Sequence, residues 1–208
     1  MSINEQKNRS VHYLFRIKEP ALITDEQADK RIQKTLNALR DAFFDLVLTY
    51  SYDEIKISDI IKKADIGRST FYQHFKSKDE ILVKSMHGPL LTLTEVIDQE
   101  NDQELLGLME HFWENRRFAP RIFSSTARRH IIASLAEKME VTLKRLTKSQ
   151  MASPAVPISL FSRQLAEAQM VLIIDWLLGK GNCAPEVMAH HISSSTVALV
   201  EIWLKKCK

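Results

Sequence analysis

Hydrophobic residues recur every three or four positions along most of this chain, which is the spacing of an amphipathic helix. The clearest case is 25–50, where the apolar positions share one face: Ile32, Leu36, Leu39, Phe43, Val47 and Tyr50. In the second half the pattern predicts helices over 102–117, 119–124, 126–150, 158–179 and 185–206. Few glycines and prolines interrupt the pattern, so the fold class it predicts is all-α.

One dipeptide divides the chain. Gly88-Pro89 falls within a helical pattern that begins after Ser77, and a proline inside a helix removes a hydrogen bond and clashes with the preceding turn. A kink or break is expected there. The sequence therefore predicts an N-terminal tail over 1–24, a first domain over 25–88 and a second helical domain over 89–208.

The stretch Ile57–Lys78, ISDIIKKADIGRSTFYQHFKSK, predicts a short helix, a tight turn and a second short helix. The turn is expected at Asp65-Ile66-Gly67. Asp65 suits it, because an aspartate tolerates the left-handed conformation better than most residues. On the second helix Phe71 and Phe75 are four residues apart and share a face, so they are expected to anchor it in the core.

The other faces of this second helix carry polar side chains suited to DNA. Arginine forms paired hydrogen bonds to guanine and glutamine to adenine, whereas tyrosine, histidine and lysine donate to phosphate oxygens. The DNA-binding candidates are Ser58, Arg68, Ser69, Thr70, Tyr72, Gln73, His74 and Lys78. Two alternatives stay open: Tyr72 and His74 are half-buried packing residues, and Thr70 binds phosphate instead of a base.

The run Thr70-Phe71-Tyr72-Gln73-His74-Phe75 followed by Lys78 resembles the hallmark of TetR-family transcriptional regulators, and residues 30–85 resemble their N-terminal domain. The resemblance implies a three-helix DNA-binding domain with a helix-turn-helix, followed by a helical ligand-binding and dimerisation domain. It also implies a homodimer on a palindromic operator, because two-fold symmetry matches paired half-sites.

Three positions depart from the family pattern. Lys56 stands where the family often has a capping threonine, so Ser58 is expected to cap the first short helix instead. Asp65 replaces a common glycine in the turn, and Gly67 replaces a common serine at the start of the second helix. These departures concern how the helices are capped and turned.

Charge adds little to this interpretation. The net charge is +3 with a pI near 8.8, and 55–85 holds seven Lys or Arg against four acids. Any DNA footprint is therefore a local face of the first domain. Two cysteines, Cys183 and Cys207, have no metal-like spacing, and the longest apolar run is too short to span a membrane, so a cytoplasmic protein is expected.

In the second half, the helices over 158–179 and 185–206 carry apolar residues on more than one face. Such helices are buried on two sides. Following the resemblance, one side is expected to face the core and the other a second copy of the chain. The alternative is one thick monomeric core.

An aromatic and arginine mixture over 109–130 is the candidate for binding a small-molecule effector such as an aromatic anion. Its candidate residues are His111, Trp113, Arg116, Arg117 and His130. In the alternative interpretation the arginines form a solvated face and the aromatic residues are ordinary core.

The sequence lacks a glycine-rich phosphate loop, a metal-ligand pair and a nucleophile elbow, so no enzyme, cofactor or metal site is expected. The function predicted is a homodimeric repressor that a small molecule releases from its operator. The alternative is an activator or co-regulator that works through a protein partner. For the tail over 1–24, a loose leader and a DNA-touching arm both stay open.

Overall fold

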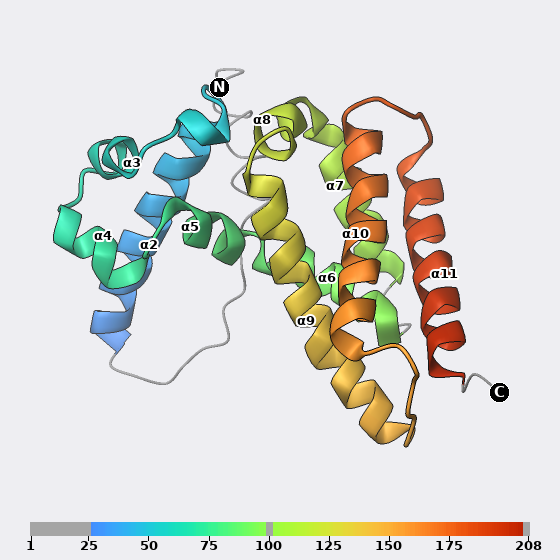
Figure 1. The fold of residues 1–208 in the computed structure, drawn as a ribbon. Helices are drawn as coiled ribbons and strands as arrows, with labels where there is room; N and C mark the ends of the chain where they lie inside the picture. The colour runs from blue at the N-terminus through green and yellow to red at the C-terminus, as the bar shows by residue number, and fades with distance from the viewer. Residues whose placement is uncertain (1–25, 99–101, 206–208) are drawn as a thin grey trace. The chain divides into compact units, whose positions relative to one another are not determined.

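The structure, a computed structural model, describes residues 26–98 and 102–205 (Figure 1). The described chain is helical without a strand, which confirms the all-α prediction. It forms two compact units. The first reaches to Gly88 and includes Pro120–Arg128; the second comprises Pro89–Ala119 and the chain from Arg129 onward. The tail over 1–24 and Cys207 lie outside the described residues.

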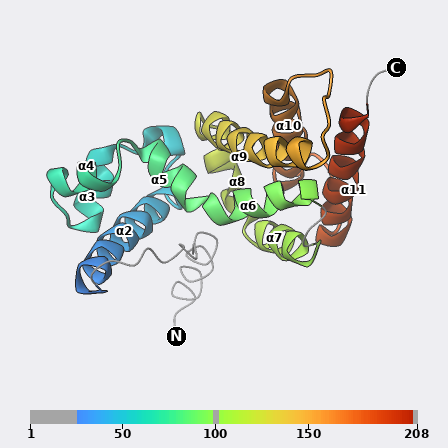
Figure 2. The ribbon, with the colours of Figure 1, turned by 90° about the horizontal axis from the view of Figure 1, so that it is seen from below.

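The first unit follows the predicted order of elements. It contains α2 (Glu26–Val47), the 3₁₀ turn η1 (Tyr52–Glu54), α3 (Ile57–Ala64), α4 (Arg68–His74) and α5 (Lys78–Ser85). Within this unit α3 and α4 lie next to each other, and α2 packs against α3 and α5 (Figures 1 and 2). The helix boundaries match those expected from periodicity to within three residues.

The core of this unit lies along one stripe of α2. Leu39, Phe43 and Val47 are four residues apart and buried, as the sequence predicted. The prediction was wrong at the two ends of the stripe, because Ile32 and Tyr50 are exposed. Tyr50 lies beyond the last turn of α2, where the helical period no longer directs a side chain to the core.

The turn between α3 and α4 has the predicted conformation. Asp65 adopts the left-handed region with φ 53° and ψ 50°, and its N–H closes the end of α3. Gly67 precedes α4 with φ −72° and ψ 150°, an ordinary extended cap geometry. The start of α3 differs from the prediction, since Lys56, and not Ser58, occupies the cap position. The Lys56 N–H donates to the Asp59 carboxylate at 3.0 Å, which is the reciprocal half of a capping box, while Lys56 itself makes no side-chain capping bond.

Ser77 caps α5, and its hydroxyl accepts the Glu80 N–H at 3.2 Å. The predicted interruption lies slightly earlier than Gly88-Pro89, at Met86, and the next helix, α6 (His87–Glu95), begins just before the proline. Pro89 is tolerated there because N–H groups in the first turn of a helix have no partner inside the helix.

The second unit contains the remaining helices. They are η2 (Val96–Asp98), α7 (Asp102–Glu114), η3 (Arg116–Phe118), α9 (Ala127–Ser149), α10 (Ile158–Leu177) and α11 (Pro185–Leu204), together with α6. The short helix α8 (Ala119–Phe123) begins the segment that returns to the first unit. α10 and α11 lie side by side, and α7 packs against α11 (Figures 1 and 2).

A buried glutamine joins three helices of this unit. The Gln169 amide on α10 donates to the Leu93 carbonyl of α6 at 3.3 Å and to the Thr196 hydroxyl of α11 at 3.0 Å. Nearby on α10 and α11, Phe161 and Trp203 stack with ring centroids 4.5 Å apart. Among the helices described, none has the length and apolar character that a membrane crossing requires.

Candidate nucleic-acid interface

α4 has one buried face and one exposed face. Phe71 and Phe75 are almost fully buried, which confirms their predicted role as core anchors. Tyr72, between them in the sequence, is 46% exposed, and Arg68, Ser69 and Gln73 are also exposed. Thr70 and His74 are partly exposed. Phe71 of α4 and its C-cap residue Phe75 are the only side chains of this helix that are buried in the core, so its other side chains can contact a partner molecule.

Arg68 and Tyr72 are neighbours on this outer side. The guanidinium carbon of Arg68 lies over the Tyr72 ring, 5.7 Å from its centroid. Within the described part of the chain, Arg68 has no hydrogen bond or ion pair, so its five N–H groups stay free to donate. The Tyr72 ring is in turn held edge-on against Phe71 at 5.2 Å. The buried anchor therefore orients the tyrosine, and the tyrosine orients the arginine.

A partly exposed ion pair joins α3 to α2 near the turn. Lys63, in the last turn of α3, forms this ion pair with Asp45 of α2 at 3.1 Å. Ser58 lies exposed in the first turn of α3, and its hydroxyl is 3.5 Å from the Asp59 carboxylate. The predicted candidates on α3 and α4 thus lie on one helix-turn-helix, whose geometry is fixed by the buried anchors and by the Asp65 turn.

Lys78 lies differently from the other DNA-binding candidates. Its ammonium donates to the carbonyls of Tyr52 at 2.7 Å and Ile55 at 2.9 Å, with a longer bond to the Asp53 carbonyl at 3.4 Å. It also lies over the Tyr52 ring, 4.5 Å from the centroid. The three protons of the ammonium are therefore occupied by the turn that precedes α3.

The same turn has a buried tyrosine that sequence reasoning missed. Tyr52 is fully buried, and its hydroxyl donates to the Asp79 carboxylate. Burial raises the pKa of Tyr52 far above its usual value, and the hydrogen bond to Asp79 with the charges of Asp79 and Asp53 adds to this. The phenol stays a neutral donor at any physiological pH.

The side chain of Asp53 was also missed. It accepts the Thr126 hydroxyl at 2.6 Å and the Thr126 N–H at 3.3 Å. No local signal in the sequence could have indicated either bond, because Asp53 and Thr126 are 73 residues apart.

The predicted effector residues at the end of α7 are engaged with their own neighbours. Trp113 stacks on Trp176 with centroids 4.7 Å apart, and the guanidinium of Arg116 lies 4.2 Å from the Trp113 centroid. Arg116 also donates to the Trp113 carbonyl at 2.7 Å. Arg117 lies over the Phe118 ring at 4.6 Å.

The two predicted histidines are both partly buried. Burial lowers the pKa of His111, against the raising effect of Glu114, and the His111 Nε2 atom is buried without a partner. His130 lies near the start of the part of α9 that belongs to the second unit. Of the five candidates, the structure brings Trp113 and Arg116 into direct contact.

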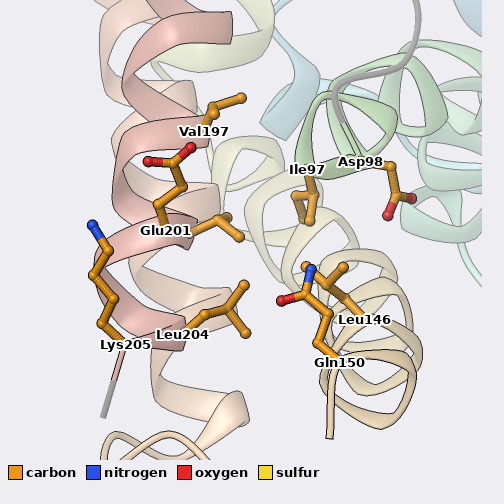
Figure 3. A pocket seen from close by; sticks show the side chains of 9 residues that line it. Ile97, Asp98, Leu146, Gln150, Val197, Glu201, Leu204 and Lys205 are labelled. Carbon is orange, nitrogen blue, oxygen red and sulfur yellow. The ribbon is translucent and has the colours of Figure 1, made fainter. Parts of the chain in front are cut away.

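A groove of about 480 Å³ lies elsewhere in the second unit, between η2, α9 and α11 (Figure 3). Its aliphatic walls are formed by Ile97, Leu146, Val197, Val200 and Leu204. Its polar lining residues are Asp98, Gln150, Glu201 and Lys205. Asp98 is already paired with Arg145, whereas the Gln150 amide points into the groove. None of the predicted effector residues lines it.

Among the described residues, no group of three or more His, Cys, Asp or Glu side chains is arranged to hold a metal ion. The first unit instead presents exposed hydrogen-bond donors on α4, a short helix that Phe71 and Phe75 anchor in the core. This is the class of helix-turn-helix proteins, in which a second helix presents its outer side to a DNA groove.

Comparisons with known proteins agree with this class. Residues 41–84 match the family model of the bacterial regulatory proteins of the TetR family. The matched segment runs from the end of α2 through α3 and α4 into α5, so the helix-turn-helix of this chain is similar to that segment of TetR-family regulators.

Two curated relatives match parts of the chain. An uncharacterized HTH-type transcriptional regulator, YxbF of Bacillus subtilis, is 42% identical over 59 residues, 28% of this chain and 16% of that protein. DhaS of Lactococcus lactis, the transcriptional activator of the dhaKLM operon, is 33% identical over 94 residues, 43% of this chain and 49% of that protein. The chain thus spans half or less of the length of these relatives.

Solved structures share the fold over most of the chain. A TetR transcriptional regulator from Streptococcus agalactiae covers 82% of this chain and 97% of its own, with a TM-score of 0.54 and 22% identity. The repressor FadR of Thermus thermophilus, in complex with lauroyl-CoA, covers 83% of this chain and 96% of its own, with a TM-score of 0.50 and 15% identity. At these identities the likeness concerns the fold.

Proposed function

We propose that this protein is a cytoplasmic, homodimeric repressor that binds a palindromic operator through α4 and leaves it when a small molecule binds the second unit. The observation that carries the proposal is the exposed outer side of α4, where Arg68 is unpaired and Tyr72 is held in place by a buried phenylalanine. An unpaired arginine at the start of a rigid short helix is suited to the guanine edge in a major groove.

The residues of the helix-turn-helix divide between bases and phosphates in this proposal. Arg68, Ser69 and Gln73 contact base edges, and Tyr72 and His74 donate to phosphate oxygens. Thr70 and Ser58 lie at the margins of the same surface and contact the backbone of the DNA. Lys78 does not contact DNA in this proposal; its ammonium stabilises the turn before α3 by donating to the carbonyls of Tyr52 and Ile55.

The proposed dimer surface lies on α10 and α11. Leu160 and Val171 are eleven residues apart on α10, and Val187 and Ile202 are fifteen apart on α11. These spacings are close to whole numbers of helical turns, so each pair shares a face. All four side chains are exposed, Leu160 to 63% and Ile202 to 66%, which fits a surface that a second copy covers.

Two places in the second unit support an effector. The groove beside Gln150 has the volume of a small-molecule site. The stretch that contains His111, Trp113, Arg116, Arg117 and His130 offers cations and aromatic rings, with Arg116 lying over Trp113. A TetR-fold repressor in complex with lauroyl-CoA supports the idea that such a domain holds an organic ligand. The ligand would act by binding more tightly to the conformation that does not fit the operator.

The decisive experiment is in vitro selection of DNA from a random duplex library, followed by footprinting and analytical ultracentrifugation of the complex. The expected result is one palindromic site protected by a dimer. Selection of no DNA by the full chain would refute the proposal, and protection of a single half-site by a monomer would refute its dimeric part.

Activation is the second candidate function, and the relation to DhaS, itself an activator, favours it. In vitro transcription from a promoter that carries the selected site separates the two. A repressor lowers transcript yield when the protein is added without ligand, whereas an activator raises it through contact with RNA polymerase or a protein partner.

A further inference from the structure

The turn η1 contacts several elements of the first unit. It follows α2 and leads, through Ile55 and Lys56, directly into α3. Tyr52 fixes it from inside, because its buried ring lies edge-on to Phe43, with centroids 6.1 Å apart, and its hydroxyl donates to Asp79 of α5. The position of η1 therefore sets where α3 begins.

Lys78 connects the same turn to the other end of the helix-turn-helix. It is the first residue of α5, which follows α4, and its ammonium holds the carbonyls of Tyr52 and Ile55. The elements before and after α4 are thus both anchored on η1. A displacement of η1 would move α3 and α5 together, and the recognition helix lies between them in the chain.

η1 also has a partner from far along the chain. The Asp53 carboxylate accepts the hydroxyl and the N–H of Thr126, the residue immediately before α9. A carboxylate beside the start of a helix is further stabilised by the partial positive charge of the helix N-terminus. Thr126 belongs to the segment Pro120–Arg128 of the first unit, and α9 continues from there into the second unit.

We propose that Asp53 is a positioning residue of the DNA-binding site: through Thr126 it ties η1, and with it the start of α3, to the first residues of α9. The inference rests on the proposed DNA-binding function. The bond lies within the first unit, at the start of the helix that continues into the second unit. Breaking the bond to Thr126 lowers operator affinity without touching any residue that faces DNA.

The test uses the full chain and the operator that wild type selects from random duplex DNA. Thr126→Val removes the hydroxyl without changing shape or charge, and Thr126→Ser keeps it. Asp53→Asn removes the charge, and Asp45→Asn is the matched control, because it removes the same charge from the first unit at the far end of α3. Operator affinity is measured by fluorescence anisotropy at constant salt.

The expected result is a loss of operator affinity of about fivefold in Thr126→Val, the size of one lost hydrogen bond. Asp53→Asn should lose less, because its amide oxygen can still accept the Thr126 hydroxyl as an uncharged and weaker acceptor. The double variant should lose no more than Thr126→Val alone, because Asp53→Asn only weakens the hydroxyl bond that Thr126→Val removes. Thr126→Ser should bind as wild type does. Asp45→Asn should bind at least as tightly as wild type, because it takes a negative charge away from a DNA-binding unit.

Amide hydrogen exchange gives a second readout that needs no DNA. The Asp59 and Ile60 amides in the first turn of α3 donate to the Lys56 carbonyl, and they should exchange faster in Thr126→Val than in Thr126→Ser. If Thr126→Val shows wild-type operator affinity and wild-type amide exchange, the positioning role of the Asp53–Thr126 bond is refuted and the proposed DNA-binding function still stands. Selection of no DNA by wild type would overturn the proposed function, and the positioning role would fall with it.

Discussion

An arginine–aromatic pair of the first unit and one of the second differ in how many of the arginine's N–H groups are already bonded within the protein. On α4, Arg68 lies over Tyr72 and makes no hydrogen bond within the described residues. At the end of α7, Arg116 lies over Trp113 and also donates to its carbonyl, while the tryptophan stacks on Trp176. Among the described residues, the Arg68 guanidinium has no hydrogen bond, whereas that of Arg116 donates one to the backbone of its own unit.

Residue type alone therefore does not identify a binding surface. The sequence shows an aromatic residue and an arginine in both places, and the stretch over 109–130 has more of them. What distinguishes the two is whether the polar atoms are already satisfied by the chain. Lys78, which lies over the Tyr52 ring in the first unit, resembles Arg116 in this respect, because its ammonium already donates to backbone carbonyls.

Removing Trp113 is the strongest way to test this comparison. Trp113→Ala deletes a ring that packs between Trp176 and Arg116, and the expected loss in the free energy of unfolding is about 3 kcal/mol. Operator affinity, measured below the unfolding temperature, should stay as in wild type. Chemical denaturation followed by circular dichroism measures the loss. A stable variant that has lost only its response to a ligand would mean that Trp113 belongs to an effector site.

Arg68→Ala should lower operator affinity and leave the free energy of unfolding almost unchanged, the reverse of Trp113→Ala. Loss of a paired contact to guanine is expected to lower operator affinity by about 2 kcal/mol and to relax the base preference at one position of each half-site. The free energy of unfolding should hardly change, since Arg68 is exposed. Anisotropy against a set of single-base operator variants measures both effects, with Arg116→Ala as the matched control. An equal loss of affinity for every operator variant would assign Arg68 to phosphate.

Lys78→Met separates a supporting lysine from a phosphate-binding one. If the ammonium holds η1, the substitution should lower the free energy of unfolding by about 1.5 kcal/mol, the value of hydrogen bonds to a charged group. The slope of log affinity against log salt should not change. A phosphate contact would instead reduce that slope by about one and leave stability almost intact.

The smallest expected effect is at the start of α4. Gly67 has the extended conformation of a helix cap, and a Cβ atom built there would lie 3.7 Å from the Thr70 hydroxyl, an ordinary contact. Gly67→Ser should therefore add a capping hydrogen bond and a few tenths of a kcal/mol of stability. Thermal unfolding measures the gain. A lower melting temperature would mean that the added hydroxyl disturbs Arg68 or Ser69.

The sequence predicted the helices, the Asp65 turn and the two phenylalanine anchors, because each follows from local spacing or backbone preference. It predicted the Ser58 cap wrongly, since α3 already begins at Ile57, where the Asp59 carboxylate accepts the N–H of the cap residue Lys56. The engagement of Lys78 and the bond between Asp53 and Thr126 could not be predicted, because they join residues more than twenty positions apart and no local pattern encodes such pairs.

The return of Pro120–Arg128 to the first unit has a consequence for exchanging parts between regulators of this kind. A fragment that stops at Gly88 would contain the whole helix-turn-helix but would leave the Asp53 carboxylate without its threonine. A chimera that grafts residues up to Gly88 onto another effector domain inherits whatever side chain that domain offers at the equivalent of Thr126. The transferable cassette is therefore discontinuous, and a working chimera needs the later segment transplanted with it.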